Sequence, residues 1–136
     1  MRLTLDDKPT RMERIGASIP RLMLAILFLL IGSSKFGAAS SWIQMFSRIG
    51  WGQWLRYLAG GMQVGGALLL LLPRTAVAGA ALIACTMAGA VYVDIAVLGL
   101  GFVAIIPFAL LAMAIGVGLQ SYFNSAHFTR QNKDIE

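Results

Sequence analysis

Residues 75–97 read TAVAGAALIACTMAGAVYVDIAV, and this stretch decides the fold class of the chain. It carries one charged residue, Asp94, in an otherwise largely apolar run. A helix needs about 20 mostly apolar residues to cross the hydrocarbon core of a bilayer. The run does not alternate between apolar and polar residues as a lipid-facing barrel strand does. We therefore expect a membrane-spanning helix, since only helices and closed barrels cross a bilayer.

Three further apolar stretches lie outward from this one, near residues 20–36, 53–72 and 101–123. The turn at residues 73–74 and the connection at residues 98–101 are short, and short turns make neighbouring helices antiparallel. The sequence therefore predicts an all-α integral membrane protein built as an antiparallel four-helix transmembrane bundle. It predicts one domain over residues 1–136, with ends at residues 1–19 and 124–136.

The longest connection, residues 38–52, predicts an additional short helix between the first and second spans. Trp42, Phe46 and Ile49 are spaced i, i+4, i+7 and would share one helix face. That pattern is typical of an amphipathic helix lying on the membrane surface. An aromatic lid over a ligand is the alternative interpretation.

Composition excludes several classes of protein. The 136 residues are 58% apolar and 12% charged, whereas soluble domains average about 45–50% and 25%. This composition argues against a soluble globular fold and against disorder. With one cysteine and one histidine, neither a disulfide framework nor a Cys/His metal site is expected. The net charge of +5 is explained by a lipid bilayer as partner, without nucleic acid.

Lysine and arginine are distributed unevenly between the two ends of the predicted spans. Eight lie on the side of both termini and three on the opposite side. Since basic residues collect in cytoplasmic loops, both termini are expected in the cytoplasm. The alternative is that the first apolar stretch is a cleaved signal peptide, but about 20 residues precede its apolar core, which is long for that role.

Small residues predict where the helices pack. Gly61 and Gly65 form a Gly-xxx-Gly pattern in the second span, and Ala80, Ala84 and Ala88 repeat the spacing in the third. Such faces let helix backbones approach closely in a membrane. The pattern fits packing within one bundle or a homodimer interface, and the sequence does not distinguish these.

Three charged residues are expected at similar depth near the outer ends of the spans: Lys35, Arg56 and Asp94. Gln63 lies seven residues after Arg56, on the same helix face. Charges at membrane depth usually face the bundle interior and find partners. We therefore predict an outer-facing polar pocket in which Asp94 pairs with the two cations. The alternative is that each charge reaches the lipid headgroups separately.

The order of these motifs resembles the DoxX-like family of small bacterial membrane proteins. The first span closes on Gly32 and Lys35, and the second reads WLRYLAGGMQVGG over residues 54–66 before a leucine run that ends at Pro73. Met87-Ala-Gly-Ala90 follows in the third. Family members commonly carry glutamate where Gln63 stands and often histidine near Asp94, so a proton-carrying role at these two positions is not expected here.

The resemblance implies a multi-pass protein of the bacterial inner membrane, associated with a quinone-linked redox system. Its expected role is that of an accessory protein or subunit without catalysis of its own, in a redox complex or a homo-oligomer. The alternatives are a quinone- or small-molecule-binding oxidoreductase component and, less well supported, a small transporter. The inner halves of the spans are nearly purely apolar, which disfavours a transport path.

Overall fold

The computed structural model describes residues 11–38, 40–99 and 101–133. Its elements, in chain order, are α1 (Arg11–Ser34), α2 (Ser40–Ile49), α3 (Trp54–Leu71), α4 (Ala76–Tyr92), the π-helix η1 (Val93–Val97) and α5 (Ile105–Lys133). No strand occurs in these described ranges, so the predicted all-α class is confirmed. Parts of the two predicted ends, residues 1–10 and 134–136, lie outside the described residues.

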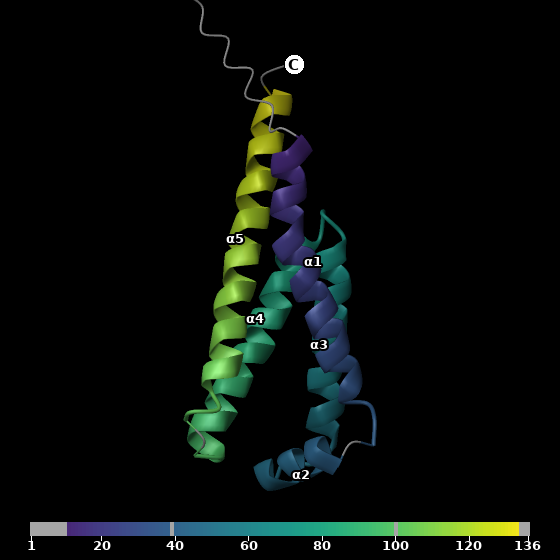
Figure 1. Ribbon diagram of the computed structural model, residues 1–136, viewed down its shortest axis with the longest axis vertical. Coiled ribbons are helices and arrows are strands. Elements are labelled where there is room, and N and C mark those ends of the chain that lie inside the picture. Colours follow the sequence, from purple (N-terminus) through teal and green to yellow (C-terminus); the bar gives the residue numbers. More distant parts are fainter. Residues whose placement is uncertain (1–10, 39, 100, 134–136) are drawn as a thin grey trace, which may run out of the picture.

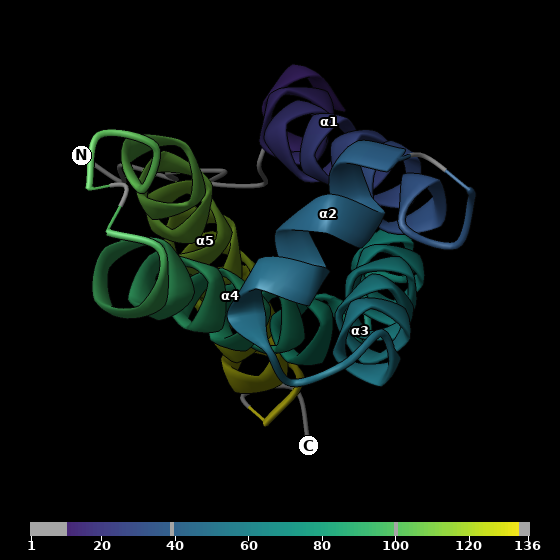
Figure 2. The ribbon, with the colours of Figure 1, turned by 90° about the horizontal axis from the view of Figure 1, so that it is seen from below.

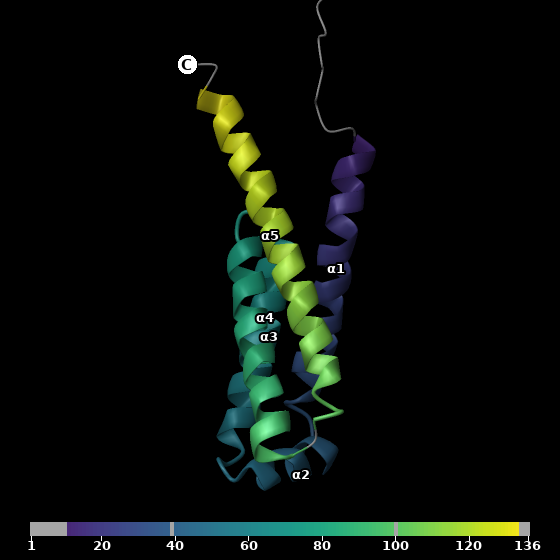
Figure 3. The same ribbon diagram turned by 90° about the vertical axis from the view of Figure 1, so that its left-hand side faces the viewer.

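The long helices alternate in direction along the chain (Figure 1). Helix α3 packs against α1 on one side and α4 on the other, and α4 packs against α5. Contacts between α1 and α5 are few, and these two helices diverge toward the end where the chain terminates (Figure 3). The helices thus form a folded row, α1–α3–α4–α5, in which the first and last members touch only loosely.

The helix bounds differ most from expectation at the first and last helices. Helix α1 begins at Arg11 and runs through Pro20, whereas the predicted span begins at Pro20. Helix α5 begins at Ile105 and continues to Lys133, ten residues beyond the predicted span. The additional turns lie outside the apolar stretches, because helices can continue past the hydrocarbon core where the sequence is polar.

Helix α4 ends in a π-helical turn. The backbone N–H of Leu98 donates to the carbonyl of Val93 at 2.9 Å, a spacing of five residues. Single π-turns within helices are rare and occur often at functional sites. This one contains Asp94, the only charged residue of the stretch that decides the fold class.

The outer surface of the helices is strongly apolar. Two segments, Ala76–Val97 and Ile105–Ala126, are long and apolar enough to cross a membrane, and only 28% and 17% of their apolar windows are buried within the protein. Large side chains such as Leu30, Ile105 and Phe108 are more than 60% exposed. Exposed apolar surface on this scale marks contact with a membrane or partner.

The interior is a narrow core contributed by all four long helices. Leu24 and Phe28 of α1, Leu70 of α3, Ile83 of α4 and Ala114 of α5 are fully buried. Lipid is as apolar as these side chains, so close van der Waals packing rather than hydrophobic burial holds such helices together.

Glycines permit that packing at two crossings. At the crossing of α1 and α3, a Cβ built on Gly32 would lie 3.1 Å from the carbonyl oxygen of Gly60. At the crossing of α3 and α4, a Cβ on Gly66 would lie 2.8 Å from Cγ1 of Ile83 and 3.1 Å from the carbonyl oxygen of Gly79. Any side chain at these positions would force the backbones apart.

The expected packing positions require correction. Gly61 is exposed and would place no Cβ within 4 Å of another described group, so it does not pack within the chain, and its alternative role in a homodimer interface stays a prediction. A Cβ on Gly65 would lie 3.9 Å from Leu82, an ordinary contact distance. The close contacts fall one residue away from both, because the inward face of α3 carries Gly60 and Gly66.

The alanines of α4 differ among themselves. Ala80 is 2% exposed, and a Cβ on Gly118 of α5 would lie 3.1 Å from its Cβ. Ala84 is half-buried and packs on the core, whereas Ala88 is exposed and lies off the contact face. Helix α5 therefore crosses α4 near Ala80, and Ala88 makes no such contact within the chain.

Candidate functional site

Four polar side chains are buried in the half of the molecule opposite the termini. Lys35 directly follows α1, Arg56 lies in the first turn of α3, Gln63 lies two turns further on, and Asp94 lies in η1. Their exposed fractions are 7%, 4%, 1% and 4%. Charged side chains are almost never this buried without a structural or functional reason, so these four residues define the candidate site.

Lys35 is held by two groups from different elements. Its Nζ donates a hydrogen bond of 2.8 Å to Oε1 of Gln63, and the ammonium lies 5.2 Å from the ring centroid of Trp42 in α2. A Cβ built on Gly60 would lie 3.2 Å from the Cβ of Lys35. The close approach of α1 to Gly60 therefore positions the lysine over Gln63.

Arg56 is bound mainly by neighbouring backbone and aromatic groups. One terminal nitrogen donates to the carbonyl of Gly37 and the other to the hydroxyl of Tyr57, both at 2.8 Å. The guanidinium also lies 4.6 Å from the centroid of the Tyr57 ring, which in turn packs against Phe36. The Nε atom of Arg56 is buried and has no hydrogen-bond partner.

Asp94 does not pair with the two cations, contrary to our expectation. Among the described residues it forms no ion pair with Lys35 or Arg56, and its buried Oδ1 has no hydrogen-bond partner. The reason is geometric: α4 packs along α3, but η1, which continues α4, makes no comparable contact with α1 or α3. A similar predicted depth along the spans is therefore not sufficient to bring side chains into contact.

Helix α2 lies across this end of the molecule (Figure 2). Phe46 and Ile49 are buried, and Trp42 is half-buried above Lys35. The predicted face thus forms, but it turns toward the protein rather than toward lipid. Gly50 and Gly52, with φ of 78° and 85°, make the turn into α3, a backbone conformation that glycine adopts without strain.

The buried polar groups of the site are hydrogen-bond donors and acceptors. Among the described residues no group of three His, Cys, Asp or Glu side chains could hold a metal ion. The site instead offers an unused donor on Arg56 and an unused acceptor on Asp94. A buried polar atom without a partner costs about 1–3 kcal/mol, and a hydrogen-bond partner for either atom would recover this.

Some contributors to the site were not identified from sequence. Tyr57 and the carbonyl of Gly37 bind Arg56, and Gly60 gives Lys35 room to pack. A sequence signal for Gly60 exists: it lies four residues after Arg56 and three before Gln63, on the polar face that a membrane helix turns inward. No pattern marks the backbone carbonyl of Gly37.

The apolar helices and the buried charges together define the class: a small helical membrane protein. The chain belongs to the DoxX-like family, whose family model matches residues 19–117. The match covers all four buried polar residues and confirms the resemblance seen in the sequence. Searches of curated proteins and of solved structures returned no match.

Proposed function

We propose that α1, α3, α4–η1 and α5 each cross the bacterial inner membrane, as one domain. Support for the two shorter spans comes from their burial pattern. Helix α3 has 18 residues, and the residues that lower its hydropathy, Arg56 and Gln63, are buried inside the protein. The apolar part of α1, Ser18–Ser34, is followed by a buried lysine. Polar groups placed inward leave a lipid-facing surface that is apolar.

Both termini would lie in the cytoplasm, with α2 and the polar site at the outer side. The support is the split of lysine and arginine, eight against three, because basic residues are retained in the cytoplasm. In this orientation α2 covers the outer ends of the long helices, and the site lies just beneath it.

The polar site, in this proposal, binds the head group of a quinone. The observation that carries it is the pair of buried cations Lys35 and Arg56, of which Arg56 has a buried Nε donor without a hydrogen-bond partner. A quinone carbonyl accepts hydrogen bonds, and a quinol hydroxyl also donates one. Lys35 and Arg56 have no paired carboxylate, so they favour a ligand that offers electron-rich oxygen atoms over a cationic ligand.

We infer an accessory role in a membrane redox system, with catalysis carried out by a partner subunit. The alternative is an oxidoreductase component that acts alone, and the two differ in whether quinone turnover requires another subunit. The site lies beneath α2 at one end, and the rest of the interior is apolar, which gives little support to a transporter. A homo-oligomer would remain compatible with either role.

The test is to purify the full chain from bacterial membranes and examine what it retains. Organic extraction, absorbance and mass spectrometry should find quinone at about one per chain. Arg56→Gln should lose it, while Arg48→Gln, which removes an exposed arginine from α2, should keep it. Wild-type protein that carries no quinone and does not take it up when supplied would overturn the assignment.

A further inference from the structure

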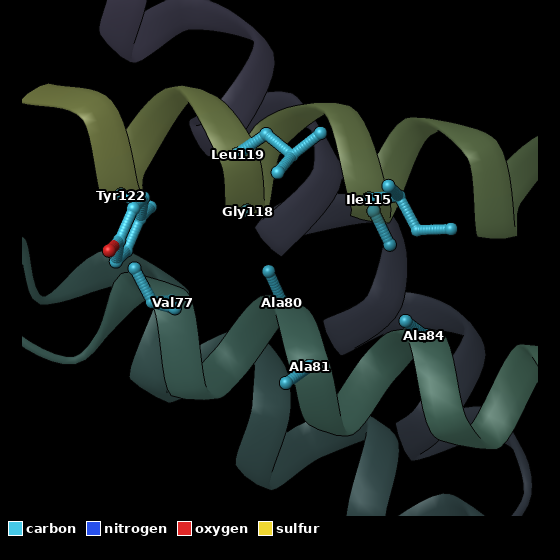
Figure 4. A pocket seen from close by; sticks show the side chains of 9 residues that line it. Val77, Ala80, Ala81, Ala84, Ile115, Gly118, Leu119 and Tyr122 are labelled. Carbon is cyan, nitrogen blue, oxygen red and sulfur yellow. The ribbon is translucent and has the colours of Figure 1, made fainter.

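A groove of about 300 Å³ lies between α4 and α5 (Figure 4), but its lining does not include the polar site. The lining extends along α4 from Val77 to Ala84 and consists of alanine, glycine and aliphatic side chains, with Tyr122 as the polar exception. Neither Lys35 nor Arg56 belongs to it. A ligand of the polar site must therefore reach these two side chains by another path.

The two cations are covered at the end of the molecule across which α2 lies (Figure 2). Trp42 of α2 lies over the ammonium of Lys35. The carbonyl of Gly37, in the segment that leads toward α2, accepts from one terminal nitrogen of Arg56, and the Nε of the same side chain is buried. A ligand as large as a quinone ring cannot contact these groups while they stay covered, so an element at this end must move to admit it.

Helix α2 is the element at this end that is best suited to move. It has ten residues, and among the described helices it has the weakest contact with the rest of the protein, mainly with α3. The turn that joins it to α3 contains Gly50 and Gly52, whose φ angles are positive. Glycine adopts positive and negative φ with similar ease, so this turn can change conformation without strain. Such short segments at the ends of elements are typical hinges.

We propose that α2 is a lid over the polar site, hinged at Gly50–Gly52 and held closed by the contact of Trp42 with Lys35. The indole attracts the ammonium through its electron-rich face, so a ligand oxygen that accepts a hydrogen bond from the same cation can replace it. Rotation of α2 about the hinge would lift the indole and expose the lysine at the outer side. The inference rests on the proposed function only for the identity of the ligand.

A second contact of the closed lid crosses the hinge. Nε2 of Gln53, the residue before α3, donates to the carbonyl of Ile43 and to the hydroxyl of Ser47, both at 3.2 Å. These bonds join the start of α3 to α2 on either side of Gly50–Gly52, so they fix the closed angle. Both are exposed, and water competes there for the same groups. They therefore hold the lid without preventing its opening.

Labelling of Lys35 by a water-soluble amine reagent, sulfosuccinimidyl acetate, measures the opening of the lid without any quinone. The full chain is purified in detergent, and mass spectrometry of its peptides gives the labelling rate at this lysine. Trp42→Leu should raise the rate about fivefold, since a cation–π contact at a partly exposed site is worth about that factor. Trp51→Leu, which removes an exposed tryptophan just after α2, should leave the rate unchanged. Equal rates in wild type and Trp42→Leu would overturn the role of Trp42.

A cross-link across the hinge tests the motion itself. Cys85→Ala removes the exposed native thiol, and Ser47→Cys with Gln53→Cys places two thiols where the side chains are in contact, so that dibromobimane can bridge them. Compared with the same chain before bridging, the bridged chain should label Lys35 about tenfold more slowly or less, because a buried amine reacts only from an open state. It should also take up no added short-chain ubiquinone.

The two readouts separate the lid from the quinone assignment. An equal labelling rate with and without the bridge would overturn the lid, whether or not quinone binds. Slower labelling in the bridged chain, with no quinone uptake by the unbridged chain or by wild type, would support the lid and overturn the quinone assignment.

Discussion

Gly32 and Gly60 bring the backbones of α1 and α3 into direct contact: the Cβ that either residue lacks would lie 3.1 Å from the carbonyl oxygen of the other. This reciprocal approach also determines the polar site. Lys35 follows Gly32 by one helical turn, and its Nζ reaches Gln63 only because the helices are this close. Packing and recognition in this protein therefore depend on the same crossing.

Gly60→Leu should destabilise the protein, while Gly61→Leu should not. A side chain at residue 60 overlaps α1, and overpacking of a tight interior costs about 1–3 kcal/mol. Residue 61 points away from every described group, so the same substitution meets no protein atom. Thermal unfolding in detergent, followed by circular dichroism, measures both. Equal losses of stability in the two variants would mean that α1 does not contact α3 specifically through Gly60.

Gln63→Leu should lower stability by about 1–3 kcal/mol, because it leaves the buried Lys35 ammonium without its hydrogen-bond acceptor. Lys35→Met in the same chain should restore most of the loss, since both polar groups are then absent. The double-mutant cycle isolates the coupling between the two side chains. Additive effects would mean that the 2.8 Å hydrogen bond contributes nothing measurable.

Asp94→Asn should cause no loss of stability, because no described cation pairs with the buried carboxylate and a buried charge without a partner is unfavourable. Breaking a buried ion pair costs about 3–5 kcal/mol by comparison. Arg56→Gln provides the contrast, since it removes two hydrogen bonds of 2.8 Å and should cost more than Asp94→Asn. Chemical denaturation of both variants in mixed micelles gives the comparison. A loss of stability above about 3 kcal/mol for Asp94→Asn would instead support the ion pair with Lys35 or Arg56 that the sequence predicted.

The orientation of the chain can be tested with a reporter enzyme that is active only in the periplasm. Fused after Lys133 it should be inactive, and inserted at the turn around Gly50–Gly52 it should be active. The second fusion is the matched control, because it lies at the opposite end of the spans, between α2 and α3. Activity in the first and none in the second would invert the proposed topology.

Much of this protein follows from local features of its sequence. Long runs without charge impose helices, because a backbone in lipid must satisfy its hydrogen bonds within the segment. The run that ends at Val97 therefore has one structural solution, and the structure places a helix over it. The spacing of Trp42, Phe46 and Ile49 likewise imposes a short helix with one apolar face. The order of the motifs along the chain was sufficient to identify the family.

The partners of each side chain were decided only by the tertiary structure. Gly60, Gly61, Gly65 and Gly66 are chemically identical, and the crossing angles of the helices determine which two of them pack. The inward face of α3 was indicated in part by Arg56 and Gln63, because polar groups turn away from lipid. Asp94 shared their depth but not their neighbours. Depth depends on position along one helix, whereas contact depends on the arrangement of several, and that arrangement left the carboxylate unpaired.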